Sequence, residues 1–204
     1  DKVVESFIGG MNGLPKEGAS PTSYYLRKHL KEATDLTTGS ATSYQHIWPL
    51  FRYAEVLLNY AEALLEATKE PDFKGTLDNV QYTVSPREAV NMIRTRVDMN
   101  AVETTGYDAF KKRLRNERRV ELAFEEHRFF DVRRWTAPGG DLSKTDRRVT
   151  GMRIEESNGQ KTYTRFSFDR QSYTSKFLKY PVSLDEVRKM LSLTGENWQN
   201  DGWN

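Results

Sequence analysis

The stretch Leu114–Trp135, LRNERRVELAFEEHRFFDVRRW, contains no glycine or proline and is rich in residues that favour helices. It predicts one long helix that starts after Gly106, at Tyr107. At 3.6 residues per turn, apolar and charged residues fall on the same face of this helix instead of on opposite faces. That face holds Phe110, Leu114, Val132 and Trp135 together with Glu117, Arg118, Glu121, Glu125 and Arg128.

Two interpretations of the charged residues on this face are open. Glu117, Glu121 and Glu125 follow one another at intervals of one turn, as in a catalytic or metal-binding carboxylate array. Arginines are as frequent as carboxylates here, which favours a buried network of ion pairs. A di-metal helical bundle uses Glu-x-x-His motifs, but Phe124 stands three residues before His127. We therefore expect an ion-pair network, no metal and no cofactor.

The segment ERRVELAFEEHRFFDVRRW closely resembles the signature helix of the SusD/RagB family, the surface glycan-binding lipoproteins of Gram-negative polysaccharide-uptake systems. Glu126 stands where the family pattern has glycine, a change that we interpret as compatible with a continuous helix. Four further segments resemble family motifs in the same order along the chain. They are SYYLRKHL (23–30), RYAEVLLNYAEAL (52–64), AVNMIRTRVDM (89–99) and the tail, from FLKYPVSLDEV (177–187) to ENWQNDGW (196–203).

Two of these segments predict an antiparallel pair of helices of tetratricopeptide type. Leu50–Ala67 carries a continuous apolar stripe, and Pro49 suits its first turn. The second helix starts at Ser85-Pro86-Arg87-Glu88, a capping box with proline at the first helical position. We expect the aromatic residues on the helix faces, Tyr53, Tyr60 and Trp135, to lie in the core.

The remaining sequence predicts smaller elements. Val149–Glu156 and Lys161–Phe168 are short strands joined through Asn158-Gly159, a strong hairpin signal. Lys176–Tyr180 is expected to be extended, and a second capping box at Ser183 opens a helix to about Leu191. Trp198 and Trp203 are expected to anchor the C-terminal tail.

The predicted fold class is mainly α: a tetratricopeptide-like αα-hairpin plus a long helix, with irregular loops and a small β-hairpin. We expect residues 1–204 to form a single SusD-like C-terminal domain. It would comprise a loop-rich segment (1–48), a helical core (49–135), a hairpin or flap (136–180) and a short helix with a tail (181–204).

The composition excludes several classes of protein. A net charge of +2 over 204 residues is too balanced for an obvious nucleic-acid binder. The absence of cysteine excludes disulfides and thiolate chemistry. No apolar run is long enough to span a membrane, and no secretory signal is visible. Because family members are longer and carry a lipidated N-terminal cysteine, we expect this chain to be a C-terminal portion.

The resemblance implies a non-catalytic glycan-binding component of an outer-membrane nutrient-uptake system. Its partner would be a SusC-like TonB-dependent transporter, and an N-terminal lipid would attach the full-length protein to the extracellular face of the outer membrane. No catalytic motif indicates an enzyme. The alternative is a tetratricopeptide-like protein-interaction module, which would carry a concave groove on its helices, whereas a glycan binder exposes aromatic residues on loops.

The ligand-binding residues are predicted by elimination, because the aromatic residues of the helix motifs are needed for packing. We therefore expect the aromatic residues of the loop-rich segment before Leu50 to stack on sugar rings. The candidate residues are Tyr24, Tyr25, Tyr44 and Trp48, with His46 as a hydrogen-bond partner.

Overall fold

The computed structural model describes residues 4–31, 33–34, 39, 41–45, 47–136, 148–169 and 174–203. Contacts divide the chain into two compact units, one formed by His29–Phe130 and one formed by Asp1–Lys28 with Asp131–Asn204. The described residues are mainly helical with two small antiparallel strand pairs, which confirms the predicted fold class. No helix among these residues is long and apolar enough to cross a membrane. That both units belong to one domain stays a prediction.

The helix α1 (Tyr53–Thr68) forms from the strongest helical pattern in the chain, although it begins after the predicted start at Leu50. Its start is fixed by Arg52, whose extended backbone ends the preceding loop. Its end is fixed by Lys69, which adopts the left-handed conformation and donates its backbone N–H to the carbonyl of Leu65. The buried stripe of α1 forms the centre of the core and consists of Ala54, Leu57, Leu58, Ala61, Leu64 and Leu65.

A small hairpin that we did not predict connects α1 to the next helix. Strands β1 (Gly75–Leu77) and β2 (Val80–Tyr82) pair in antiparallel register. The two turn residues, Asp78 and Asn79, have φ values of 49° and 63°, as a tight two-residue turn requires. Asn and Asp adopt this conformation more readily than other non-glycine residues, so the signal was present in the sequence.

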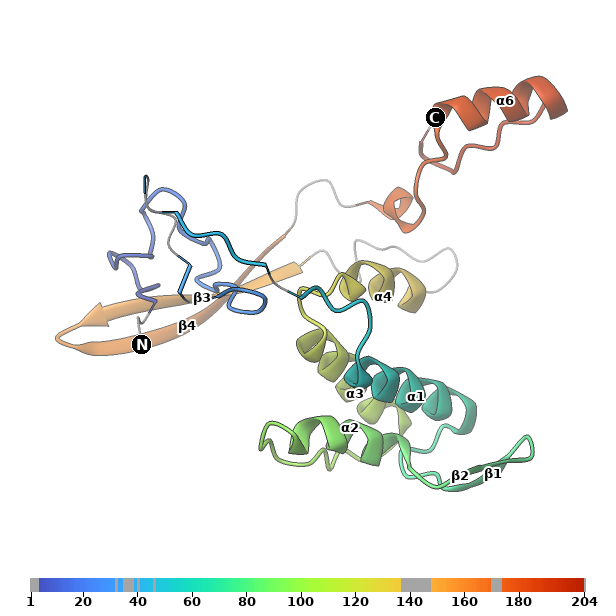
Figure 1. Cartoon of the computed structure of the whole chain (residues 1–204), viewed down its shortest axis with the longest axis horizontal. Coiled ribbons are helices and arrows are strands. Elements are labelled where there is room, and N and C mark those ends of the chain that lie inside the picture. Colours follow the sequence, from blue (N-terminus) through green and yellow to red (C-terminus); the bar gives the residue numbers. More distant parts are fainter. Residues whose placement is uncertain are drawn as a thin grey trace. The chain divides into compact units, whose positions relative to one another are not determined.

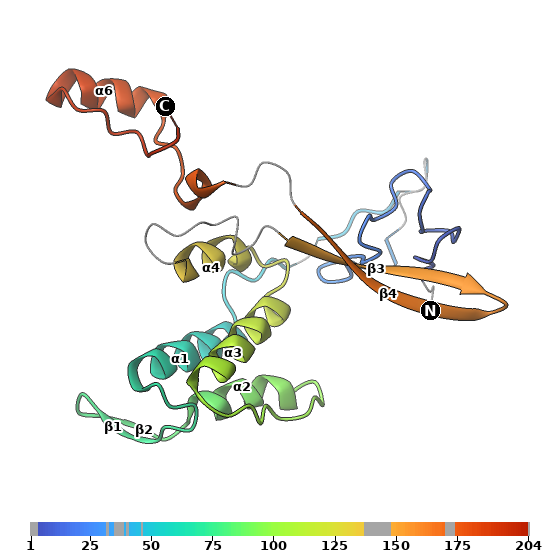
Figure 2. The same cartoon turned by 180° about the vertical axis from the view of Figure 1, so that it is seen from behind.

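The helix α2 (Pro86–Thr95) begins where the sequence predicted it. The Ser85 side chain accepts a hydrogen bond from the Glu88 backbone, and the Glu88 carboxylate accepts one from the Ser85 backbone, which confirms the capping box. The helices α1, α2 and α3 (Tyr107–Glu121) lie side by side in both views (Figure 1 and Figure 2). The predicted pair of helices is present, and Phe110 and Leu114 of α3 join the α1–α2 core, so a third helix covers it.

The single long helix predicted over Tyr107–Trp135 is wrong. The chain forms α3 up to Glu121 and a separate helix α4 (His127–Trp135), with a turn between them. Phe124 and Glu126 in this turn have φ values of 62° and 66°, in the left-handed region that a continuous helix excludes. Glu126 occupies the position where the family pattern has glycine, so our interpretation of this change as helix-compatible was also wrong.

The long hairpin of the other unit confirms its prediction. Strands β3 (Arg148–Ser157) and β4 (Gln160–Asp169) pair along their whole length. Asn158 and Gly159 form the turn, with φ values of 52° and 75°. Two backbone hydrogen bonds attach the N-terminal segment to β3: Ile8 N–H to Ile154 O at 2.9 Å and Met152 N–H to Thr22 O at 3.0 Å.

The C-terminal region differs from its prediction in two places. A 3-10 helix, η1 (Ser175–Leu178), replaces part of the segment expected to be extended. The helix α6 (Leu184–Thr194) starts directly after Ser183 as predicted, and the Ser183 side chain caps it by accepting from the Glu186 backbone. Trp203 anchors the tail by donating to the Lys176 carbonyl at 3.0 Å. Trp198 is exposed, so its prediction as an anchor is wrong.

Candidate ligand-binding surfaces

The carboxylates predicted on the charged face of α3 belong to a buried ion-pair network. Glu117 Oε2 accepts from Arg94 Nη1 at 2.7 Å, and the two side chains are only 8% and 7% exposed. Arg118 is also buried, and it donates to the Asn59 side chain at 2.7 Å. Glu117 and Arg94 form the ion pair that burial of their charges requires, which confirms the predicted ion-pair network on this face.

Arg52 extends this network from α1. It donates to Glu121 Oε1 at 2.5 Å and, through Nε, to Glu125 Oε2 at 2.7 Å. The hydrogen bond to Glu125, followed by that to Glu121, raises the pKa of Arg52 above its ordinary value despite the opposing effect of burial. Among the described residues, no group of three or more His, Asp and Glu side chains is placed to hold a metal ion.

Tyr24 and Tyr25 lie exposed on the loop of the N-terminal segment. The Tyr25 hydroxyl accepts from the Ser20 backbone N–H at 2.9 Å and donates to the Asn12 carbonyl. Its ring therefore stands in a position fixed by the loop, while 40% of the residue remains exposed. Tyr24 is 57% exposed. The structure thus leaves both predicted tyrosine faces accessible, and it gives Tyr25 an additional structural role.

Tyr44 and Trp48 belong to the other unit and are also exposed, at 49% and 47%. The Lys31 ammonium lies 4.6 Å from the centroid of the Tyr44 ring, at the distance of a cation–π interaction. The His29 ring lies 5.2 Å from the Trp48 ring. Each aromatic side chain is therefore supported from one side by a basic residue. The fifth candidate, His46, lies outside the described residues.

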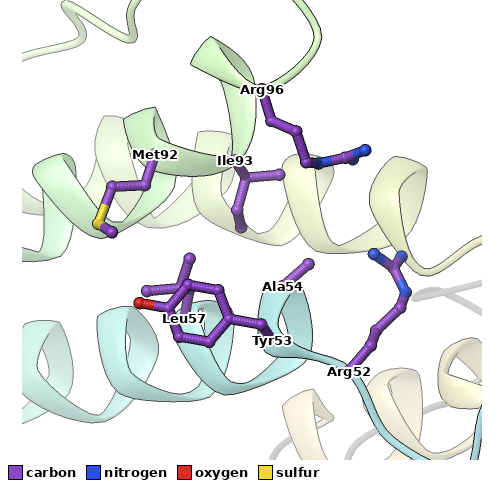
Figure 3. Close-up of a pocket in the computed structure, with 7 residues that line it drawn as sticks. All are labelled: Arg52, Tyr53, Ala54, Leu57, Met92, Ile93 and Arg96. Carbon is purple, nitrogen blue, oxygen red and sulfur yellow. The ribbon is translucent and has the colours of Figure 1, made fainter.

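The structure contains a second surface that the sequence prediction missed. A hollow of about 400 Å³ lies between α1 and α2 (Figure 3). Figure 3 shows Tyr53 and Leu57 of α1 facing Met92 and Ile93 of α2. At one end stand two basic residues, Arg52 and Arg96, from the start of α1 and the end of α2.

Tyr53 corrects another prediction, because it was expected in the core and is instead 65% exposed. A second hollow of about 410 Å³ continues from the first, since Tyr53, Leu57 and Met92 line both. It runs towards β2. We call the combined surface the α1–α2 groove. Its apolar and aromatic walls are Tyr53, Ala54, Val56, Leu57 and Tyr60 on α1, Met92 and Ile93 on α2, Val80 and Tyr82 on β2, and Val84.

The helical hairpin, with its buried ion pair and its lateral groove, defines the class as a mainly helical protein. The chain belongs to the SusD family, whose model matches residues 2–203. This match confirms the resemblance seen in the sequence.

A solved structure of a SusD-like protein from Bacteroides fragilis is similar to this chain. The two share 29% sequence identity, with a TM-score of 0.51 over 77% of this chain. The chain spans 26% of the length of that structure. No curated protein matches the sequence.

Proposed function

We propose that this chain belongs to a protein that binds glycans at the extracellular face of the outer membrane for nutrient uptake. Membership of the SusD family supports this function, because members of the family are surface glycan-binding lipoproteins. The protein would bind without catalysis and pass its ligand to a SusC-like TonB-dependent transporter. An N-terminal lipid on the full-length protein would hold it at the membrane.

The observation that carries the proposal is the exposure of aromatic rings on loops. Tyr24, Tyr25, Tyr44 and Trp48 each keep between 40% and 57% of their surface accessible. Flat rings of this kind stack on the apolar faces of sugar rings, while neighbouring polar groups bind sugar hydroxyls. The predicted stacking residues are therefore accessible to a ligand.

Tyr44 and Trp48 are the strongest of these candidates. Their basic neighbours, Lys31 and His29, support each ring and bring hydrogen-bond donors near it. Tyr25 contributes through its fixed position, because its hydroxyl is already engaged by the loop backbone. Tyr24 is proposed as a further stacking residue on its own loop, and His46 stays a predicted hydrogen-bond partner.

The test is isothermal titration calorimetry of the chain against a panel of oligosaccharides, neutral and acidic. We expect Tyr44→Ala and Trp48→Ala each to reduce affinity by about 1–3 kcal/mol while leaving the melting temperature nearly unchanged. Tyr163→Ala is the control, because Tyr163 is 62% exposed on β4, away from the proposed residues in sequence. Unchanged binding with a lowered melting temperature at Tyr44 and Trp48 would mean that these rings serve packing.

The second candidate function, a tetratricopeptide-like protein-interaction module, is favoured by one observation. Such modules carry a groove on their helices, and the α1–α2 groove has that position. Both functions can reside in one chain because the loop aromatics and the groove use different residues.

A further inference from the structure

The outer edge of β4 carries backbone groups that point away from β3. The N-terminal segment binds the outer edge of β3 at the Met152 N–H and the Ile154 carbonyl, so these two residues turn their backbone groups away from β4. Residues directly opposite each other in an antiparallel pair turn these groups alike, both towards the partner strand or both away from it. Arg165 and Tyr163 face Met152 and Ile154, and they therefore turn their N–H and C=O groups outward.

Among the described residues, no backbone group of another segment bonds to this outer edge of β4. Every residue of β4 except Phe166 is exposed, and Tyr163 is 62% exposed. Natural edge strands are usually short, or are protected by a proline, a bulge or a covering segment. β4 is ten residues long, contains no proline, and pairs with β3 without a bulge. Its outer edge is therefore a template for another extended strand.

The side chains of β4 are complementary to those of a second copy of β4. Two copies can pair in antiparallel orientation about a two-fold axis, and here we place the axis at Thr164. Tyr163 then faces Arg165 of the second copy, which makes a cation–π pair. Thr164 faces Thr164, and Thr162 faces Phe166, as in the Thr–Thr and aromatic–β-branched pairs that stabilise sheets.

The positive charges of β4 select this register over the two adjacent ones. Arg165 makes no ion pair within the described part of the chain, and Lys161 lies 3.8 Å from Glu156. With the axis at Arg165, the two Arg165 side chains would face each other, and with the axis at Tyr163, Lys161 would face Arg165 of the second copy. Like charges directly opposite each other destabilise a sheet. With the axis at Thr164, the two Arg165 side chains are diagonal neighbours and no like charges face each other.

We propose that the outer edge of β4 is a self-association surface, at which two copies of the chain join their long hairpins into one continuous antiparallel sheet. Residues 160–168 of each β4 pair about an axis at Thr164. An interface of one strand on each side is small, so the dimer dissociates at low concentration. This inference goes beyond glycan binding and does not depend on it.

A single cysteine at the axis traps this dimer. The chain contains no cysteine, so a one-cysteine variant can form a disulfide only between two copies. Because the backbone groups of Thr164 turn towards β3, Thr164 faces its own copy as a non-hydrogen-bonded pair, whose Cα atoms are about 4.5 Å apart and within disulfide reach. Thr162→Cys is the matched control on the same exposed strand. The two copies of Thr162 are displaced along the strands by about 13 Å, beyond disulfide reach.

Non-reducing electrophoresis after mild oxidation of the full 204-residue chain measures the trapping. We expect Thr164→Cys to give about fivefold or more covalent dimer than Thr162→Cys. In the Thr164→Cys background, Tyr163→Lys should lower the yield by about threefold or more, because it places like charges opposite each other, whereas Tyr163→Glu should not lower it. Both changes fall on the same exposed position, so they have similar effects on the monomer.

Sedimentation of the cysteine-free chain tests the edge itself, and its average mass should rise with concentration. Arg165→Pro removes an outward N–H of β4 and should abolish this rise while leaving the β3–β4 hydrogen bonds in place. Thr150→Pro is the control, because Thr150 is exposed and likewise turned outward on β3, and this variant should associate normally. Hydrogen exchange of the strand amides shows whether both variants keep the hairpin.

Three results would overturn the proposal. Equal trapping of Thr164→Cys and Thr162→Cys would attribute the disulfides to random collisions. A monomer at every concentration, with no trapped dimer, would show that the edge does not self-associate. Association that persists in Arg165→Pro and does not respond to the charge at Tyr163 would place the interface elsewhere. If Arg165→Pro loses the hairpin, the Tyr163→Lys and Tyr163→Glu variants decide.

Discussion

The guanidinium of Arg52 joins two carboxylates that lie on either side of the point where α3 ends. Glu121 is the last residue of α3, and Glu125 lies in the turn that follows. Arg52 Nη1 lies 2.5 Å from Glu121 Oε1, and Nε lies 2.7 Å from Glu125 Oε2. Arg52 also donates from Nη2 to the Glu121 carbonyl at 2.6 Å. One side chain thereby fixes both the end of α3 and the path of the turn against the start of α1.

We expect Arg52→Met to lower the free energy of unfolding by about 2 kcal/mol. The change leaves the two largely covered carboxylates without this cation, which destabilises the folded state. The loss is smaller than for a fully buried ion pair, because the Arg52 side chain is 27% exposed. Arg52→Lys should recover only part of the loss, because an ammonium cannot reproduce the planar fork. Urea denaturation measures these differences. Arg119→Met is the control on an exposed position of α3, and a loss there equal to that of Arg52→Met would contradict the prediction.

Glu126→Gly should stabilise the chain by about 1 kcal/mol. Glu126 has a φ of 66°, where its Cβ is crowded by the backbone and glycine is not. Glu126→Ala keeps the Cβ and should give no comparable gain. Thermal unfolding of the two variants separates the conformational effect from the loss of charge, because both remove the carboxylate. If Glu126→Ala stabilised the chain as much as Glu126→Gly, the stabilisation would come from removing the charge and not from the backbone conformation.

The parts of the fold that could be predicted are those set by local chemistry. The Ser85 capping box and the Asn158-Gly159 turn each depend on a few adjacent residues, and both appear where the sequence indicated. The ion-pair network was predictable because charges on an apolar face require partners. The break after Glu121 was missed because Leu122–Glu126 contains neither glycine nor proline, and its two left-handed residues are held by contacts distant in sequence, including that of Arg52 with Glu125.

The candidate surfaces were predictable to different degrees. The exposure of Tyr44 and Trp48 followed from their position in a loop-rich segment. The α1–α2 groove was missed because helical periodicity assigns every apolar residue of a strong helix to the core. Periodicity cannot distinguish a side of α1 that is covered by α2 and α3 from a side that remains open, so Tyr53 was placed in the wrong environment.

Glu66 should make stability depend on pH in the acidic range. Burial pushes the pKa of its carboxyl upward, but hydrogen bonds from Lys111, Tyr107 and Lys69 outweigh this effect and lower the pKa to about 2 from an ordinary value of 4.5. Because the folded-state pKa is the lower one, the stabilisation is fully present above about pH 4.5 and is lost as pH falls towards 2.

The corresponding experiment compares Glu66→Gln with the unmodified chain from pH 7 to pH 2. The variant should be less stable at neutral pH, and the difference in free energy of unfolding should shrink as pH falls through the range between 4.5 and 2. Glu70→Gln, an exposed neighbour, is the control and should show a much smaller difference. A Glu66→Gln difference that stays constant with pH would contradict the prediction.

Gly151→Ala should destabilise the β3–β4 hairpin, although alanine usually improves a strand position occupied by glycine. A Cβ at this position would lie 2.6 Å from the Phe166 ring on the paired strand and 3.0 Å from the Cα of Thr22. The close contact therefore reverses the usual sign, and we expect a cost of about 1–3 kcal/mol. Hydrogen exchange of the β3 and β4 amides reports this loss locally. In a Phe166→Ala background the cost should fall, because the ring is gone and only the contact with Thr22 remains. An equal cost in both backgrounds would mean that the Phe166 ring is not the obstacle.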